Sequence, residues 1–149
     1  MRELVTAGAG FLLAVLWFDL MFDVQALRHR GPEVPETALE SIAAYYRRVT
    51  TDARPMNLLV GAAMVATLAA IVAQIAAGDD PEWVAWASLV LAGGAIGLAV
   101  AHTFSNARRL GARADAPHIQ SRLARSICRD HLMCFPAIAL VLVLQLAFA

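Results

Sequence analysis

The chain has 149 residues, of which 60% are apolar and 16% are charged, and its mean hydropathy is +0.62. These values are typical of a membrane protein and exclude an ordinary water-soluble domain. Its 12 basic and 12 acidic residues cancel, so the net charge gives no reason to expect nucleic-acid binding. Cys128 and Cys134 form no Cys-X-X-Cys pair and point in different directions on one helix, which disfavours quinone-coupled thiol chemistry.

Four apolar segments are long enough to cross a bilayer, which requires about 20 helical residues. They lie at about 4–25, 56–77, 83–104 and 131–148. The sequence therefore predicts an all-α fold, an integral membrane bundle of four transmembrane helices that forms a single domain over residues 1–149. The lipid bilayer is its first expected partner.

The first apolar segment has a second interpretation, a cleaved signal peptide that ends near Val24-Gln25-Ala26. However, its only arginine, Arg2, is followed by Glu3, and two aspartates interrupt the end of the apolar run. Neither feature suits an export signal. We therefore expect this segment to remain in the protein as the first span.

All 12 basic residues are arginines, and apart from Arg2 they lie in the first and third connections between the spans. The second connection holds Asp79, Asp80 and Glu82 and no basic residue. By the positive-inside rule, the two arginine-rich connections are cytoplasmic and both termini lie outside. We expect a multi-pass protein of a bacterial inner (plasma) membrane, with most of its arginines near anionic lipid headgroups.

Both arginine-rich connections contain helical patterns. Apolar residues at helical spacing within 36–51 predict a short amphipathic cytoplasmic helix. Its apolar stripe consists of Leu39, Ile42, Ala43, Tyr46 and Val49. Tyr45 and Tyr46 are suited to the lipid headgroup level. In the third connection, a stripe that begins after Pro117 is predicted to continue directly into the fourth span.

Small residues on the third span predict close helix packing. Gly93, Gly97 and Ala101 form a ridge that lets two backbones approach each other. We expect this ridge to pack within the bundle, and a homo-oligomer contact is the alternative.

Asp19 and Asp23 in the first span lie four residues apart and therefore on one helix face. An aspartate at the centre of a membrane helix costs about 2.5–3.5 kcal/mol, so such acids indicate a functional site. Alternating spans bring further polar residues to the same cytoplasmic half of the bundle. One polar pocket is predicted from Asp19, Asp23, Asn57, His102, Asn106 and His131.

Three interpretations of this pocket remain open on the residues alone. The acids accept hydrogen bonds that lock the bundle, or they carry protons or ions across it with a histidine as relay. In the third interpretation His102, His131 and Asp19 hold a transition metal such as iron, copper or zinc. No pair with metal-ligand spacing lies on one helix, so this geometry depends on how the helices pack.

Three sequence features are shared with a known group of proteins. They are Gly10-Phe11-Leu12-Leu13-Ala14, Tyr45-Tyr46-Arg47-Arg48, and the exit of the third span, 103–110. In these features the chain resembles the anthrone-oxygenase-like group of small four-helix membrane proteins. The resemblance implies an oxidoreductase step with molecular oxygen on an apolar, aromatic or quinone-like small molecule. Only Asn106 carries over as a site residue, because 126–131 lacks the Trp and Asn that the group places there.

The working hypothesis is an oxidoreductase-type site. His131 or His102 acts as metal ligand or general base, and Asp19 orients it. Asn106 donates a hydrogen bond, and the remaining pocket members, Asp23 and Asn57, hold the cofactor or ligand. The alternatives are an oligomeric proton or ion pathway and an assembly subunit without chemistry of its own.

Overall fold

A computed structural model of the protein describes residues 1–79 and 81–148, and every regular element in this part of the chain is helical. The long helices are α1 (Arg2–Arg28), α3 (Arg54–Ala77), α4 (Glu82–Leu98) and α6 (Pro117–Ala147). The shorter elements are α2 (Glu36–Arg47), α5 (Phe104–Ala112) and two π-helical turns, η1 (Arg48–Asp52) and η2 (Ala99–Thr103).

The four predicted spans all lie in helices that are long and apolar enough to cross a membrane, which confirms the helical-bundle prediction. Two of these helices extend beyond the predicted spans by two turns or more. The third continues through η2 and α5 to Ala112, and the fourth begins at Pro117. The stripe after Pro117 therefore runs directly into the fourth span, as predicted.

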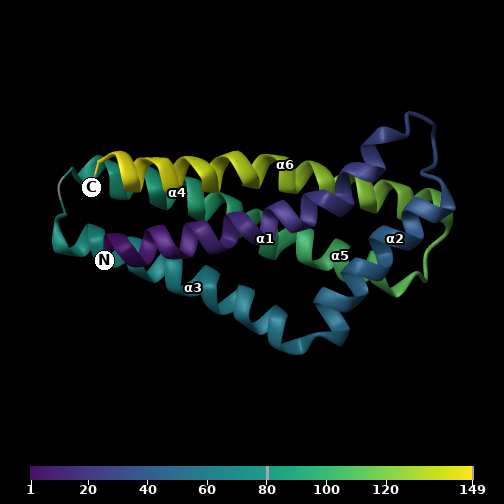
Figure 1. Ribbon diagram of the computed structural model, residues 1–149, viewed down its shortest axis with the longest axis horizontal. Helices are drawn as coiled ribbons and strands as arrows, with labels where there is room; N and C mark the ends of the chain where they lie inside the picture. Colours follow the sequence, from purple (N-terminus) through teal and green to yellow (C-terminus); the bar gives the residue numbers. More distant parts are fainter. Residues whose placement is uncertain (80, 149) are drawn as a thin grey trace.

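The long helices run lengthwise, and both chain termini lie at one end of the molecule, here called the terminal end (Figure 1). At the opposite, arginine-rich end, α2 and α5 pack beside the end of α1 and the beginning of α6 (Figure 1). Helix α3 lies beside α1 at the terminal end and diverges from it toward the arginine-rich end (Figure 1).

Two separate apolar cores hold the helices together. The terminal core consists of Val5, Ala9, Leu12, Ala70, Ile71, Ala92, Ala95, Ile96, Cys134, Ile138 and Val141. The arginine-side core consists of Ala26, Val34, Ala38, Leu39, Ile42, Ala43, Tyr46, Ala107, Leu110, Leu123, Ala124 and Ile127. Helices α1 and α6 contribute residues to both cores, so each has a stretch that lies between the two cores.

The inward faces of α1 and α6 repeat with alternating steps of four and three residues. On α1 the positions are 5, 9, 12, 16, 19, 23 and 26, and on α6 they are 120, 124, 127, 131, 134, 138, 141 and 145. This period is typical of helices that pack side by side at a small crossing angle. Because Asp19, Asp23 and His131 occupy positions of these stripes, the helix period itself directs them inward.

Large apolar side chains cover much of the outer surface and form what we call the apolar belt. On the third long helix the exposed belt residues run from Trp83 to Phe104, and on α6 they run from Leu132 to Phe148. Beyond Phe104 and Leu132, toward the arginine-rich end, the exposed residues of α5 and α6 include Arg108, Arg122 and Arg129. The edge of the belt therefore lies at the level of residues 104 and 132.

The amphipathic helix α2 packs on protein rather than on lipid headgroups. Its predicted apolar stripe is confirmed, because Leu39, Ile42 and Tyr46 are buried. The stripe faces the arginine-side core, which includes Ala107 and Leu110 of α5. The headgroup placement predicted for Tyr45 and Tyr46 is thus wrong for Tyr46, whose ring lies inside the protein.

The predicted small-residue ridge on the third span stays open in this chain. A Cβ atom added at Gly93 or Gly97 would have no described atom within 4 Å outside its own helix, and Gly97 and Ala101 are exposed. The close helix contacts occur elsewhere. A Cβ at Gly111 of α5 would lie 2.8 Å from the backbone nitrogen of Arg47, so α5 and α2 touch through their backbones.

Candidate functional site

A layer of polar side chains separates the two apolar cores. On α1 it contains Asp19 and Asp23, which follow the terminal core and precede Ala26. On α6 it contains Asp130 and His131, and η2 contributes the buried Thr103. We call these five residues the polar layer. A buried carboxylate needs hydrogen-bond donors or a cation, so the neighbours of each acid define what the layer can do.

The ring of His131 lies between the two carboxylates of α1. Its Nδ1 is 2.6 Å from Oδ2 of Asp23, and its Nε2 is 3.7 Å from Oδ2 of Asp19. The Asp23 side chain is fully buried, whereas 8% of His131 and 14% of Asp19 remain accessible. An imidazole nitrogen this close to a carboxylate carries the hydrogen and donates it. Nε2 is therefore the ring nitrogen that is free to gain or lose a proton.

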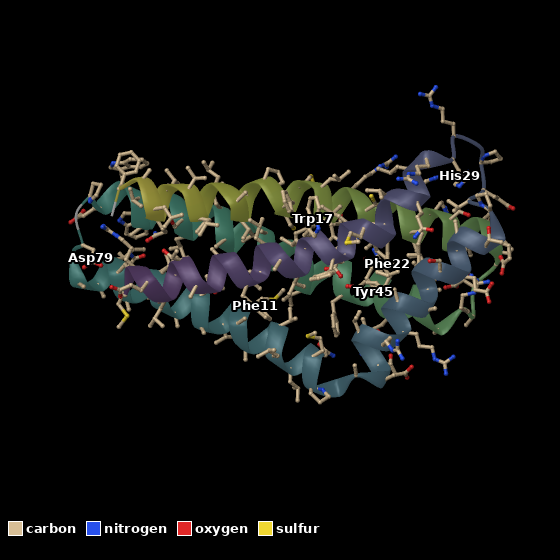
Figure 2. All side chains as sticks on the ribbon, viewed as in Figure 1. Phe11, Trp17, Phe22, His29, Tyr45 and Asp79 are labelled. Carbon is tan, nitrogen blue, oxygen red and sulfur yellow. The ribbon has the colours of Figure 1, made fainter. Side chains whose placement is uncertain are left out.

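Two adjacent tyrosines of α2 complete the group. The hydroxyl of Tyr46 donates to Oδ1 of Asp23 at 2.7 Å, and that of Tyr45 donates to Oδ1 of Asp19 at 2.7 Å. The Tyr45 ring stacks on Phe22 with centroids 4.2 Å apart, and Figure 2 shows these two side chains close together between α2 and α1. Each acid of α1 therefore has its own phenol donor from a second helix.

The two phenols stay protonated in this setting. Burial raises the pKa of Tyr46 well above its ordinary value of 10.0, and the negative charge of Asp23 raises it further. Burial and the charge of Asp19 raise the pKa of Tyr45 in the same direction. Both hydroxyls therefore act as donors to the carboxylates at any physiological pH.

A second polar group lies beside the first. Asp130 accepts hydrogen bonds from Nδ1 of His102 at 2.7 Å and from the hydroxyl of Thr103 at 2.9 Å. The amide Nδ2 of Asn106 donates to Nε2 of His102 at 3.1 Å. Nδ1 of His102 therefore faces a carboxylate, and its Nε2 faces an amide. Unlike His131, His102 is about half exposed and has a partner within hydrogen-bond distance on each nitrogen.

The six predicted pocket residues thus separate into three places. Asp19, Asp23 and His131 come together, and His102 with Asn106 forms the second group around Asp130. The remaining member, Asn57, donates to the backbone carbonyl of Thr50 at 3.3 Å, where η1 meets α3. The geometry also places Asp23, not Asp19, in the orienting position on Nδ1 of His131.

The metal site predicted from His102, His131 and Asp19 gains no support from the geometry. Among residues 1–79 and 81–148, no group of three or more His, Cys, Asp and Glu side chains is arranged to hold a metal ion. The two histidines pair with different carboxylates, Asp130 and Asp23. Both ring nitrogens of His102 are engaged in hydrogen bonds, and so is Nδ1 of His131.

The predicted pocket did not include Asp130 and Thr103 of the second group, nor the two tyrosines. One signal for Tyr46 was present, because it lies on the apolar stripe of α2 and a buried stripe tyrosine needs a partner for its hydroxyl. Tyr45 lies next to the stripe and has no such signal. Its role depends on how α2 folds back against α1, which local patterns do not determine.

A separate polar cluster lies at the terminal end. Nε2 of Gln74 donates to Oε1 of Gln145 at 3.1 Å, and Nε2 of Gln145 donates to the hydroxyl of Ser88 at 3.0 Å. The terminal core, which includes the buried Ile71 and Ile138, lies between this cluster and the polar layer. The two polar regions are therefore separated by packed apolar side chains.

The two cysteines of α6 are free and buried.

Comparisons with known protein families, with characterised proteins and with solved structures find no significant match to this chain.

Proposed function

We propose that this is a multi-pass membrane protein with an acid–base site at which His131 and Asp19 exchange a proton with an apolar small molecule. The observation that carries the proposal is the unequal position of His131 between two carboxylates. Nδ1 is held by Asp23 at 2.6 Å, whereas Nε2 lies 3.7 Å from Asp19. This arrangement fixes one ring nitrogen and leaves the other available for proton transfer.

Each residue of the site has a distinct role in the proposed proton transfer. Asp23 orients the imidazole and stabilises the imidazolium that forms when Nε2 accepts a proton. Asp19 is the next acceptor and the most accessible member of the three. Tyr45 and Tyr46 donate to the Oδ1 atoms of the two acids, whereas His131 lies near their Oδ2 atoms. The phenol donors stabilise the negative charges of the carboxylates.

The surroundings of the site favour an apolar partner molecule. Trp17 and Phe18, which immediately precede Asp19 in sequence, are each more than half exposed on the apolar belt. With the arginine-rich end in the cytoplasm, the polar layer lies at the cytoplasmic edge of the membrane. An apolar molecule dissolved in the bilayer can therefore approach at the level of Asp19. The oxygen-dependent oxidoreductase step implied by the family resemblance remains a prediction about the reaction carried out there.

A proton pathway through a single chain has weaker support. The polar layer and the Gln74–Gln145 cluster are separated by the terminal core, so the described residues give a proton access from one side only. A pathway would require a second polar route, which an oligomer would have to supply.

Infrared spectroscopy tests the proposal without a known substrate. The wild-type protein in lipid nanodiscs is titrated while the carbonyl band of protonated carboxyl groups is followed. We expect one component of this band to be lost in Asp19→Asn and retained in Glu40→Gln, which removes an exposed acid of α2. His131→Gln, which cannot accept the proton, should shift the pH at which the band appears. Circular dichroism and size-exclusion chromatography verify that each variant is folded.

Two results would contradict the proposed function. If Asp19→Asn leaves the infrared titration unchanged, the acids are structural hydrogen-bond acceptors. If the protein in liposomes conducts protons and Asp19→Asn abolishes this flux, the site belongs to a pathway rather than to a one-sided acid–base centre.

A further inference from the structure

A groove of about 560 Å³ opens on α5 and α6 at the arginine-rich end. Four arginines contribute to its wall, together with His102 and Asn106 of the second polar group. The arginines are Arg109, Arg122, Arg125 and Arg129. Four guanidinium groups around one hollow repel one another, and an anion placed among them removes this repulsion.

Most of this positive charge has no carboxylate to neutralise it. Arg109 donates two hydrogen bonds of 2.7 Å to Asp115 and is paired. Arg125 donates to backbone carbonyls, including that of Pro32, which fixes its position but leaves its charge uncompensated. Arg122 and Arg129 are exposed and form no ion pair with an acidic residue in the described part of the chain. Three guanidinium charges are thus available to an anion.

The position of the groove indicates the kind of anion. Arg129 lies one helical turn before Leu132, which is 45% exposed, and His102 lies two residues before Phe104, which is 40% exposed. These two apolar residues mark the edge of the apolar belt. The groove therefore opens where a bilayer that covers the belt has its headgroups. Its own wall also contains apolar surface from Ile119 and Leu123.

We infer that this groove binds the phosphate of an anionic phospholipid, with the acyl chains lying along Phe104 and Leu132. Guanidinium groups bind phosphate oxygens through paired, charge-assisted hydrogen bonds, and this chain uses arginine throughout and has no lysine. A free phosphate ester shares the headgroup chemistry but gains nothing from the apolar edge. A phospholipid should therefore bind more tightly than a free phosphate ester, because only the phospholipid has acyl chains that contact the apolar edge.

Native mass spectrometry of the purified protein in detergent tests this inference. Phosphatidylglycerol, phosphatidylcholine and sn-glycerol 3-phosphate are titrated separately, and the bound fraction is measured. We expect phosphatidylglycerol to bind the wild type more tightly than the other two compounds. The double variant Arg122→Gln, Arg129→Gln should lose about tenfold or more in this affinity, since each arginine near a headgroup contributes about 1 kcal/mol.

A matched control removes the same charge outside the groove. Arg28→Gln, Arg30→Gln changes two exposed arginines near the end of α1 and should keep the affinity within about twofold. Arg122→Lys, Arg129→Lys retains the charge and serves if the glutamine variant does not fold. It should still lose affinity, because lysine cannot form the paired contacts.

Three outcomes would overturn the inference. Equal losses in the groove variant and the control variant would indicate general surface electrostatics. Equal binding of phosphatidylglycerol and phosphatidylcholine would exclude recognition of anionic lipid. Binding of glycerol 3-phosphate as tight as that of phosphatidylglycerol would assign the groove to a soluble phosphate ester.

Discussion

At the residue scale, the division of roles between the two acids of α1 comes from His131. The spacing of Asp19 and Asp23 predicts that they share one helix face, and both contact the same imidazole. The spacing does not say which acid is hydrogen-bonded and which lies 3.7 Å away, because that depends on how α6 is placed along α1. The tyrosine donors come from a third helix, so they too depend on tertiary packing.

The tyrosines provide a direct optical probe, because the chain contains only two and both belong to the site. We expect the tyrosinate absorbance of the folded protein to appear only well above pH 10.0, since burial raises the pKa of both groups. Because the folded-state pKa of each tyrosine is raised, the tyrosines do not change the free energy of unfolding below their unfolded-state pKa. This free energy falls as the pH rises from the unfolded-state pKa toward the folded-state pKa. Ultraviolet pH titration of the folded and denatured protein measures the difference.

The same titration of two variants tests whether the neighbouring acid raises the pKa of Tyr46. Asp23→Asn removes a negative charge beside Tyr46, so tyrosinate should form at lower pH than in the wild type. Glu40→Gln, on the exposed side of α2, should leave the curve unchanged. If both tyrosines of the folded protein titrate near pH 10.0, they do not occupy the buried, acid-bonded positions described above.

At the element scale, helix type and length follow from local patterns, whereas helix partners do not. Periodicity and apolar length predict the four long helices and the stripe of α2. The ridge of Gly93 and Gly97 satisfies the same local rule for close packing and yet faces open space. A small residue permits a close approach, but only the arrangement of neighbouring helices determines whether a backbone is there to use it.

At Gly111 the backbones of α5 and α2 do approach closely, so a larger residue there should destabilise the protein. In Gly111→Ala the new Cβ would lie 2.8 Å from the backbone nitrogen of Arg47, so α5 and α2 must move apart. We expect a loss of about 1–3 kcal/mol in stability, as for other overpacked sites. Thermal unfolding in detergent, followed by circular dichroism, measures this loss as a lower midpoint.

Gly97→Ala provides the matched helix control. Its Cβ would meet no described atom within 4 Å outside its helix, and alanine favours the helical backbone by up to about 1 kcal/mol over glycine. This variant should unfold at or above the wild-type midpoint. Equal destabilisation by both substitutions would contradict the assignment of the α2–α5 contact to Gly111.

At the scale of the whole molecule, both termini lie at one end and the arginine-rich connections at the other (Figure 1). The positive-inside rule then predicts that the termini lie outside the membrane. Reporter fusions test this orientation. Alkaline phosphatase, which is active only outside the cytoplasm, should be active when fused after Phe148 and inactive when fused after Arg113. The opposite pattern would place the acid–base site at the outer edge of the membrane.

The position of the polar layer between the two cores also has an energetic consequence. Moving one charge across a whole membrane exchanges about 2.3 kcal/mol with the electric field for every 100 mV. In a membrane that covers the apolar belt, a proton that enters and leaves through the edge near Asp19 crosses only a small part of that field. On the proposed function, turnover at His131 therefore exchanges little energy with the membrane potential and depends only weakly on whether the cell is energised.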